Sequence, residues 1–215
     1  TTTVGTVTDI DGNEYKTVKI GNQWWMAENL RVTRYRNGDS IRHVADDNLW
    51  KDLTEGAYAE YDHAGLNIIP YGRLYNWYAV NDSRGVAPEG WRVATDEDWK
   101  ELEAYIGIPK DQLNIYQWRG TDEGDKLKEK GTLHWVAPNA GATNEFGFSA
   151  RPNGYRDYGG FRGLAYQAYF WTSTEYVIDN TSYAWARSLY YSYGTISRVF
   201  YQKTLGIGIR CVKDE

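Results

Sequence analysis

The sequence predicts an α+β fold, on three observations. Short alternating strand patterns occupy both ends of the 215-residue chain. Two amphipathic helical patterns, at 72–80 and 95–106, lie between those ends. The five Pro are scattered singly, and no low-complexity linker interrupts the chain. Because strands at both ends with helices between them are typical of α+β domains, we expect 1–215 to be one domain whose N- and C-terminal strands pair.

The first forty residues predict three strands joined by two tight turns. Alternating apolar residues precede Asp11-Gly12, a dipeptide that accepts the positive φ angles of a two-residue hairpin turn. A second strand pattern ends at Gly21-Asn22, and a third follows over 23–27. The stretch 37–70 has weak periodicity and many Asp, Asn and Gly, so we expect it to be mostly irregular.

The helices are predicted from apolar spacing and from one capping pattern. In 72–80 the apolar residues recur at helical spacing, and Trp77 is expected to pack on a sheet. Thr95 and Asp98 form a capping pattern at the start of the second helix, which should bury Trp99. Both helices are therefore expected to contact the sheet through a Trp.

A short third helix at 122–129 and an alternating final strand at 205–212 complete the expected elements. Cys211, the only cysteine, lies in that strand. A nucleophilic thiol needs an accessible, electropositive position, whereas Cys211 follows alternating apolar residues. We interpret it as a small buried apolar group.

Composition excludes several classes of protein. No apolar run approaches the roughly 20 residues of a transmembrane helix, and the mean hydropathy is −0.68, so no membrane span is expected. The net charge of −5 argues against a nucleic-acid partner. One Cys excludes a disulfide framework and a multi-cysteine zinc site. An aromatic content of 16% excludes disorder.

No cofactor is expected, although a structural calcium ion in the 37–65 loop stays open. Its oxygens would come from Asp46, Asp47 and Asp62. The three histidines, His43, His63 and His134, are far apart in sequence and lack metal-ligand spacing. We interpret them as loop residues, and a metal or general-base role for His63, next to Asp62, stays open.

The C-terminal third contains an excess of Tyr. Ten Tyr lie across 151–201, and between Ser182 and Tyr201 five Tyr alternate with four Ser. Tyr and Ser together supply rigid contact area and adaptable hydrogen bonds, as in antibody binding loops. A sheet core accounts for Trp171 and Trp185, but neighbours in a strand face opposite sides, so it does not account for Tyr190-Tyr191. We expect a binding face here.

This binding face is expected to use no catalytic residue. Its residues are Tyr166, Tyr169, Tyr176, Tyr183, Tyr190, Tyr191, Tyr193, Arg198 and Tyr201. Tyr190, Tyr191 and Tyr193 cannot all be buried if the interpretation is right. The framework aromatics, which should lie mostly in the core, are Trp24, Trp25, Trp77, Trp91, Trp99, Trp171 and Trp185.

Several long motifs occur in order along nearly the whole chain. They are TVTDIDGNEYKTVKIGNQWWMAENLRVTRY, YGRLYNWYAV, GVAPEGWRVATDEDWKELEAYIG and FGFSARPNGYRDYGG, followed by AYFWTSTEY, AWARSL and LGIGIRCVKD. These motifs resemble the Fibrobacter succinogenes major paralogous domain. The resemblance implies a C-type lectin-like fold of the formylglycine-generating-enzyme type, with paired terminal strands, two main helices and long irregular loops. The helix entry at Gly90–Trp99 and the final strand at Gly206–Val212 carry that second likeness.

The resemblance also implies an exported bacterial protein, at the cell surface or lipid-anchored, whose leader has been removed. The calcium-binding tripeptides of animal C-type lectins are absent, so calcium-bridged sugar binding is not implied. Formylglycine-generating enzymes need a reactive pair of Cys, and this chain has one. Some proteins of this branch are variable proteins of diversity-generating retroelements, and 160–203 has their layout of framework residues interrupted by Tyr, Ser, Asn, Thr and Ile.

The expected function is non-catalytic binding of a protein or glycan on another surface, in the manner of an adhesin. One alternative is a metal-dependent enzyme related to formylglycine-generating enzymes, in which His63 or His134 meets carboxylates in a pocket. A second alternative is a structural cell-surface module whose aromatic patch contacts a neighbouring domain. The oligomeric state does not follow from the sequence.

Overall fold

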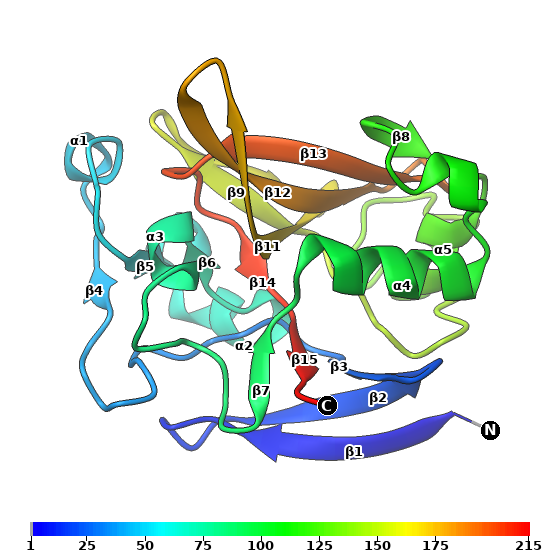
Figure 1. Cartoon of the computed structure of the whole chain (residues 1–215), viewed down its shortest axis with the longest axis horizontal. Coiled ribbons are helices and arrows are strands. Elements are labelled where there is room, and N and C mark those ends of the chain that lie inside the picture. The colour runs from blue at the N-terminus through cyan, green and yellow to red at the C-terminus, as the bar shows by residue number, and fades with distance from the viewer. Residues whose placement is uncertain (1) are drawn as a thin grey trace.

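Two five-stranded β-sheets form the body of the protein, and its longest helix, α4 (Asp96–Ile106), lies between them at one side (Figure 1). This computed structural model describes residues 2–215. Apolar side chains from both sheets and from α4 meet in one buried cluster that includes Trp25, Trp99 and Phe170. The chain is therefore α+β and mostly sheet, as the sequence predicts.

The N-terminal sheet has the order β1-β2-β3-β15-β7. Its strands are β1 (Thr3–Thr8), β2 (Glu14–Ile20), β3 (Gln23–Met26), β15 (Cys211–Lys213) and β7 (Trp91–Val93). The three predicted N-terminal strands are confirmed, and Gly21-Asn22 is the two-residue turn between β2 and β3. Val212 of β15 pairs with Trp25 of β3. The predicted pairing of the two ends of the chain is therefore confirmed.

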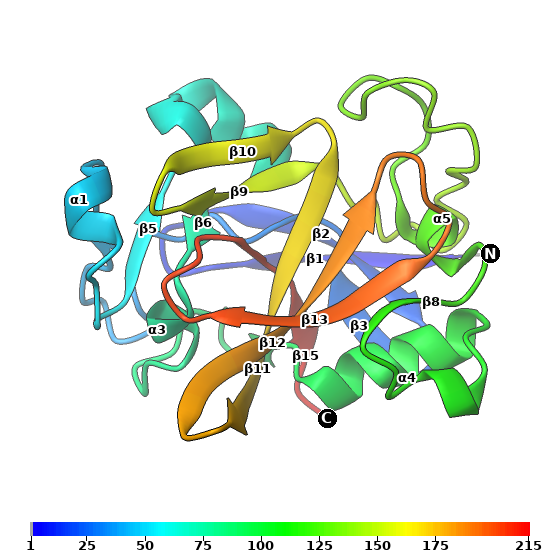
Figure 2. The same cartoon turned by 90° about the horizontal axis from the view of Figure 1, so that it is seen from above.

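The second sheet has the order β14-β11-β12-β13-β8. Its strands are β14 (Gly208–Ile209), β11 (Gln167–Ile178), β12 (Thr181–Tyr190), β13 (Ile196–Gln202) and β8 (Gln117–Arg119). Antiparallel β11, β12 and β13 form its centre, and the hairpin of β9 (Asn153–Asp157) and β10 (Gly160–Leu164) lies beside them (Figure 2). The Tyr-rich segment therefore forms the longest strands of the protein.

The remaining helices and strands are short. A small sheet has the order β4-β5-β6, with β4 (Arg42–His43), β5 (Ala57–Ala59) and β6 (Leu74–Tyr75). The short helices are α1 (Asp47–Trp50), α2 (Ile68–Tyr71), α3 (Trp77–Val80), α5 (Glu123–Leu127), η1 (Tyr61–His63), η2 (Gly65–Asn67) and η3 (Lys110–Gln112). The stretch 37–70, expected to be mostly irregular, thus contains six very short elements.

The capping pattern at the start of α4 is confirmed. The Thr95 side chain accepts a hydrogen bond from the Asp98 amide, and the Asp98 carboxylate accepts one from the Thr95 amide. Trp99 is buried, with its ring centroid 5.1 Å from that of Trp25 and 5.5 Å from that of Phe170. Gly107 ends the helix at φ 127°, a conformation that favours glycine. The predicted short third helix corresponds to α5.

The predicted two-residue turn at Asp11-Gly12 is wrong. Thr8 pairs with Glu14, so a five-residue loop joins β1 to β2. The Asp9 carboxylate holds this loop by accepting hydrogen bonds from the amides of Asp11 and Asn13 and from the Tyr15 hydroxyl. A side chain that ties a loop together in this way competes with the tighter backbone turn.

The predicted helix over 72–80 is only one turn long. Residues 74–75 form β6, and helix α3 begins after Asn76. The buried Asn76 side chain accepts hydrogen bonds from the amides of Ala79 and Ala57, so it caps α3 and holds β5 at once. Trp77 still packs on the second sheet as predicted, because its indole N–H donates to the Thr172 carbonyl, 2.8 Å away.

The predicted final strand over 205–212 is broken at Arg210 into β14 and β15. Arg210 is fully buried, and its guanidinium donates to the carbonyls of Met26, Phe148 and Ser149. Burial lowers the pKa of Arg210 to about 9. The Arg210 side chain thus holds the point where the chain passes from β14 in the second sheet to β15 in the N-terminal sheet. An unbroken strand would not place the guanidinium among these three carbonyls.

Candidate functional site: a tyrosine cluster on an anchored turn

Five partly or fully exposed aromatic side chains form a continuous cluster beside the turn between β12 and β13. Neighbouring ring centroids lie 4.8–5.6 Å apart along the series Tyr166, Tyr191, Tyr190, Tyr193 and Trp118. Tyr166 and Tyr193 are 47% and 46% exposed, and Tyr190 and Tyr191 are half-buried. We call these five residues the tyrosine cluster. Four of them were predicted as site residues, and none of the four is buried.

The turn that carries the cluster is anchored from beneath by Lys128. Its ammonium group donates to the main-chain carbonyls of Tyr190, Tyr191 and Tyr193 at 3.0–3.3 Å. It also lies 2.8 Å from the Asp125 carboxylate, and its side chain is only 1% exposed. Because carbonyl groups are common to every residue, this anchor fixes the backbone without depending on which side chains the turn displays.

Helix α5 provides a second anchor through its first amides. The Gly124 amide donates to the Gly194 carbonyl at 2.6 Å. A Cβ atom at Gly194 would lie 2.6 Å from the Thr121 carbonyl oxygen, and one at Gly124 would lie 2.5 Å from the Thr195 carbonyl oxygen. The two glycines therefore allow the turn and the helix to approach each other closely.

Two predicted site residues, Tyr176 and Tyr183, belong to a separate aromatic group around Phe200. Their ring centroids lie 4.6 and 5.2 Å from that of Phe200, and both are half-buried. Tyr116 stacks on Phe200 from the other side. Val177, next to Tyr176 in the β11–β12 hairpin, is 61% exposed. This group lies at the opposite end of β12 from Tyr190.

Tyr169 and Tyr201 lie on the sheet between these two groups. Tyr169 is buried at 7% exposure, so its prediction as a surface contact is wrong. In β11 it faces Ser188 of β12, and its ring packs edge-on against Tyr155 and Tyr201. Burial and the neighbouring phenols of Tyr116 and Tyr155 raise the pKa of half-buried Tyr201 to about 12. Both phenols therefore remain neutral at physiological pH.

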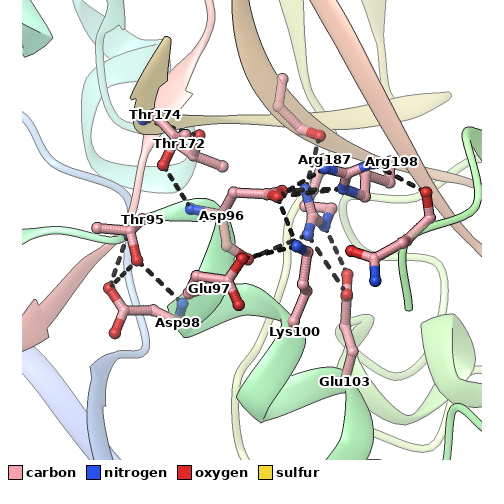
Figure 3. A network of polar contacts seen from close by, with 12 residues as sticks. Thr95, Asp96, Glu97, Asp98, Lys100, Glu103, Thr172, Thr174, Arg187 and Arg198 are labelled. Atoms are coloured by element: carbon pink, nitrogen blue, oxygen red, sulfur yellow. Dashed lines mark hydrogen bonds and ion pairs between the residues drawn. The ribbon is translucent and has the colours of Figure 1, made fainter. Parts of the chain in front are cut away.

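Arg198 was predicted as a site residue and is a buried framework residue instead. Its guanidinium contacts the Asp96 carboxylate at 2.7–3.2 Å (Figure 3). It also lies 3.5 Å from the centre of the Trp185 ring. It is 7% exposed. The prediction failed because an inward-facing Arg and a surface Arg look the same in the sequence of a strand. Only the structure shows that the buried Asp96 carboxylate of α4 lies opposite Arg198.

Asp96 and Arg198 belong to a larger buried network that joins α4 to the second sheet (Figure 3). Arg187 of β12 donates to Asp96 at 2.7 Å and to Glu103 at 2.6 Å. Glu103 also pairs with Arg119 of β8. Breaking a buried pair by removing one partner typically costs about 3–5 kcal/mol, so this network holds strands β8, β12 and β13 firmly against the helix.

The network also sets the charge state of its members. Burial alone would raise the pKa of Asp96, but the hydrogen bonds and charges of Arg198 and Arg187 lower it well below its usual value. Burial lowers the pKa of Arg119 to about 10. Arg187 keeps a raised pKa, because Glu103 and Asp96 outweigh its complete burial. Asp96, Arg119 and Arg187 therefore remain charged at neutral pH.

The structure gives no support to a metal site. Within residues 2–215 no three His, Cys, Asp or Glu side chains converge as metal ligands. Asp46 caps α1, and Asp47 pairs with Arg156 at 2.6 Å. His134 does pair with a carboxylate, Glu129, at 2.6 Å.

Cys211 is buried, and burial raises the pKa of its thiol, as its interpretation as an apolar group requires.

Sequence reasoning missed Trp118, Lys128 and Asp96. Trp118 is 37% exposed and joins the cluster only because β8 pairs with β13, which brings Trp118 opposite Ser197. Lys128 ends a short polar helix and has no apolar pattern around it. Asp96 lies in the first turn of α4, and only the long-range approach of Arg187 and Arg198 gives it its role in the network. None of these three pairings has a local sequence signal.

No helix in residues 2–215 combines the length and apolar character that a membrane crossing needs. No curated protein and no solved structure matches the chain. A family model does match: residues 18–213 fit the Fibrobacter succinogenes major domain. That match spans the second sheet, α4, the tyrosine cluster and the N-terminal sheet except β1 and the start of β2, so the chain belongs to the Fibrobacter succinogenes major domain family.

Proposed function

We propose that this chain is a non-catalytic binding protein that holds a protein partner through the tyrosine cluster. The observation that carries the proposal is the cluster of exposed rings on a turn whose backbone is fixed by Lys128. Tyr and Trp are enriched among residues that dominate interface energetics. A backbone that is already ordered lowers the entropic cost of binding, so the same contacts give higher affinity.

The proposal includes an exported protein with a C-type lectin-like fold. Its support is the pairing of the terminal strands and the long second sheet that displays the Tyr-rich segment. It also includes diversification of 160–203, because Lys128, Asp96 and Glu103 lie outside that segment and hold it through its main-chain carbonyls and through its inward-facing Arg187 and Arg198. Sequencing sibling copies of the gene tests this part: substitutions spread evenly along the chain would contradict it.

The binding proposal is tested by capture from bacterial surface extracts, followed by direct measurement with the purified partner. A triple variant carries Tyr190→Ala, Tyr191→Ala and Tyr193→Ala. The matched control is Tyr105→Ala, which removes a ring that is 59% exposed on α4, far from the cluster in sequence. We expect the triple variant to lose the partner and the control to retain it. Equal capture by both variants would refute the proposal, and capture of a glycan alone would replace protein by glycan as the partner.

A further inference from the structure

A cavity of about 370 Å³ lies at the end of β13 that is away from the tyrosine cluster. Its walls come from α1 and the residues after it, from the β9–β10 turn, and from the chain following β13. Pockets that bind small molecules usually enclose roughly 300–1,000 Å³. The cavity is therefore large enough for a small ligand, and it is distinct from the aromatic cluster described above.

Three residues that line this cavity are aromatic: Trp50, Tyr158 and Tyr201. Trp50 is fully buried, and its indole N–H donates to the Thr204 carbonyl at 2.8 Å. The Arg156 guanidinium lies 4.4 Å from the Trp50 ring, which fixes the indole from the other side. Tyr158 at the rim is 77% exposed, and half-buried Tyr201 lines the cavity beside it. Trp50 is thus held rigidly, and the ring of Tyr158 is open to a ligand.

The polar side chains of the cavity are free to bind a ligand. Within residues 2–215 five of them make no hydrogen bond or ion pair: Lys51, Asp52, Tyr158, Gln202 and Thr204. Together they offer both donors and acceptors, since hydroxyl and amide groups supply both. Lys51 and Asp52 carry opposite charges, and the Asp157 carboxylate lies 3.3 Å from Arg162. The cavity therefore favours a ligand rich in hydroxyl groups and without net charge.

We propose that this cavity binds a neutral saccharide unit. The hydroxyl groups of a sugar ring match this mixture of donors and acceptors, and the C–H face of the ring can lie on the exposed ring of Tyr158. This site goes beyond the proposed contact between the tyrosine cluster and a protein. It uses neither that cluster nor a bound metal ion.

The test is saturation-transfer NMR on the wild-type protein with cellobiose, maltose and lactose, with no macromolecular partner present. Glucuronic acid and glucosamine serve as charged probes. We expect transfer to at least one neutral disaccharide, and a loss of affinity of about tenfold or more in Tyr158→Ala and Gln202→Ala, both at exposed positions. Tyr105→Ala, outside the cavity, should bind as the wild type does.

Three results would overturn the saccharide proposal: no transfer to any neutral disaccharide, undiminished transfer in Tyr158→Ala, or preferential binding of a charged probe. An amide spectrum and a melting curve recorded on each variant establish that it is folded. Because no protein partner is present, a negative result leaves the proposal for the tyrosine cluster standing. Conversely, if the tyrosine cluster proves not to bind a protein, the saccharide measurement keeps its meaning.

Discussion

Replacing Lys128 with Met removes the anchor beneath the tyrosine cluster while keeping an apolar side chain of similar length. The change removes the Lys128 donor from three carbonyls, of which that of Tyr190 keeps the Tyr193 amide, and it leaves the Asp125 carboxylate without its Lys128 partner. Loss of one partner of a buried pair costs about 3–5 kcal/mol. Because Asp125 is 17% exposed and can regain some hydration, we expect the lower end, about 3 kcal/mol.

Differential scanning calorimetry measures this loss directly. In a domain of this size 1 kcal/mol corresponds to about 2–4 °C, so Lys128→Met should melt about 6–12 °C below the wild type. Hydrogen exchange should also speed up for the amides of 190–195, because their backbone is no longer held. Lys130→Met is the control, since Lys130 is exposed two residues away. Equal melting temperatures for the two variants would refute the role assigned to Lys128.

Three further predictions concern the framework and the cluster. The free energy of unfolding should be constant near neutral pH and should fall as the pH drops below 3.8, the ordinary pKa of Asp, toward the lower folded-state pKa of Asp96. A carboxylate with a lowered pKa stabilises the folded protein fully only above its unfolded-state pKa. When unfolding is measured across acidic pH, Asp96→Asn should therefore show a shallower fall in this free energy. The triple Tyr→Ala variant should melt within a few degrees of the wild type, since the anchors hold carbonyls; a collapse of the fold would show that the rings are structural. Cys211 should react with a thiol reagent only on unfolding, and rapid labelling of the native protein would contradict its burial.

The sequence predicted the elements whose signals are local. Alternation identified β1–β3, and the Thr95–Asp98 capping pattern placed the start of α4 correctly. The helix over 72–80 was predicted too long because apolar spacing cannot show that Asn76 also holds a neighbouring strand. Arg210 breaks the final strand for a similar reason, since its carbonyl partners lie more than sixty residues away in sequence.

The candidate site was predicted in part, for the same physical reason. Tyr content located the segment, and the consecutive Tyr190-Tyr191 pair indicated exposure correctly. Strand alternation alone could not assign Tyr169 and Arg198 to the interior, because the burial of both faces of β11 around Tyr169 and the position of Asp96 depend on tertiary packing. Side chains from distant elements therefore decide which of the predicted residues can contact a partner.

We propose that the exposed rings of the tyrosine cluster bind the partner. The most direct measurement is the dissociation constant of the captured partner for the wild type and for the triple variant Tyr190→Ala, Tyr191→Ala and Tyr193→Ala. One hot-spot residue contributes at least about 2 kcal/mol, so we expect the dissociation constant to rise about 30-fold or more in the triple variant. A change of less than about threefold, in a variant that melts as the wild type does, would contradict it.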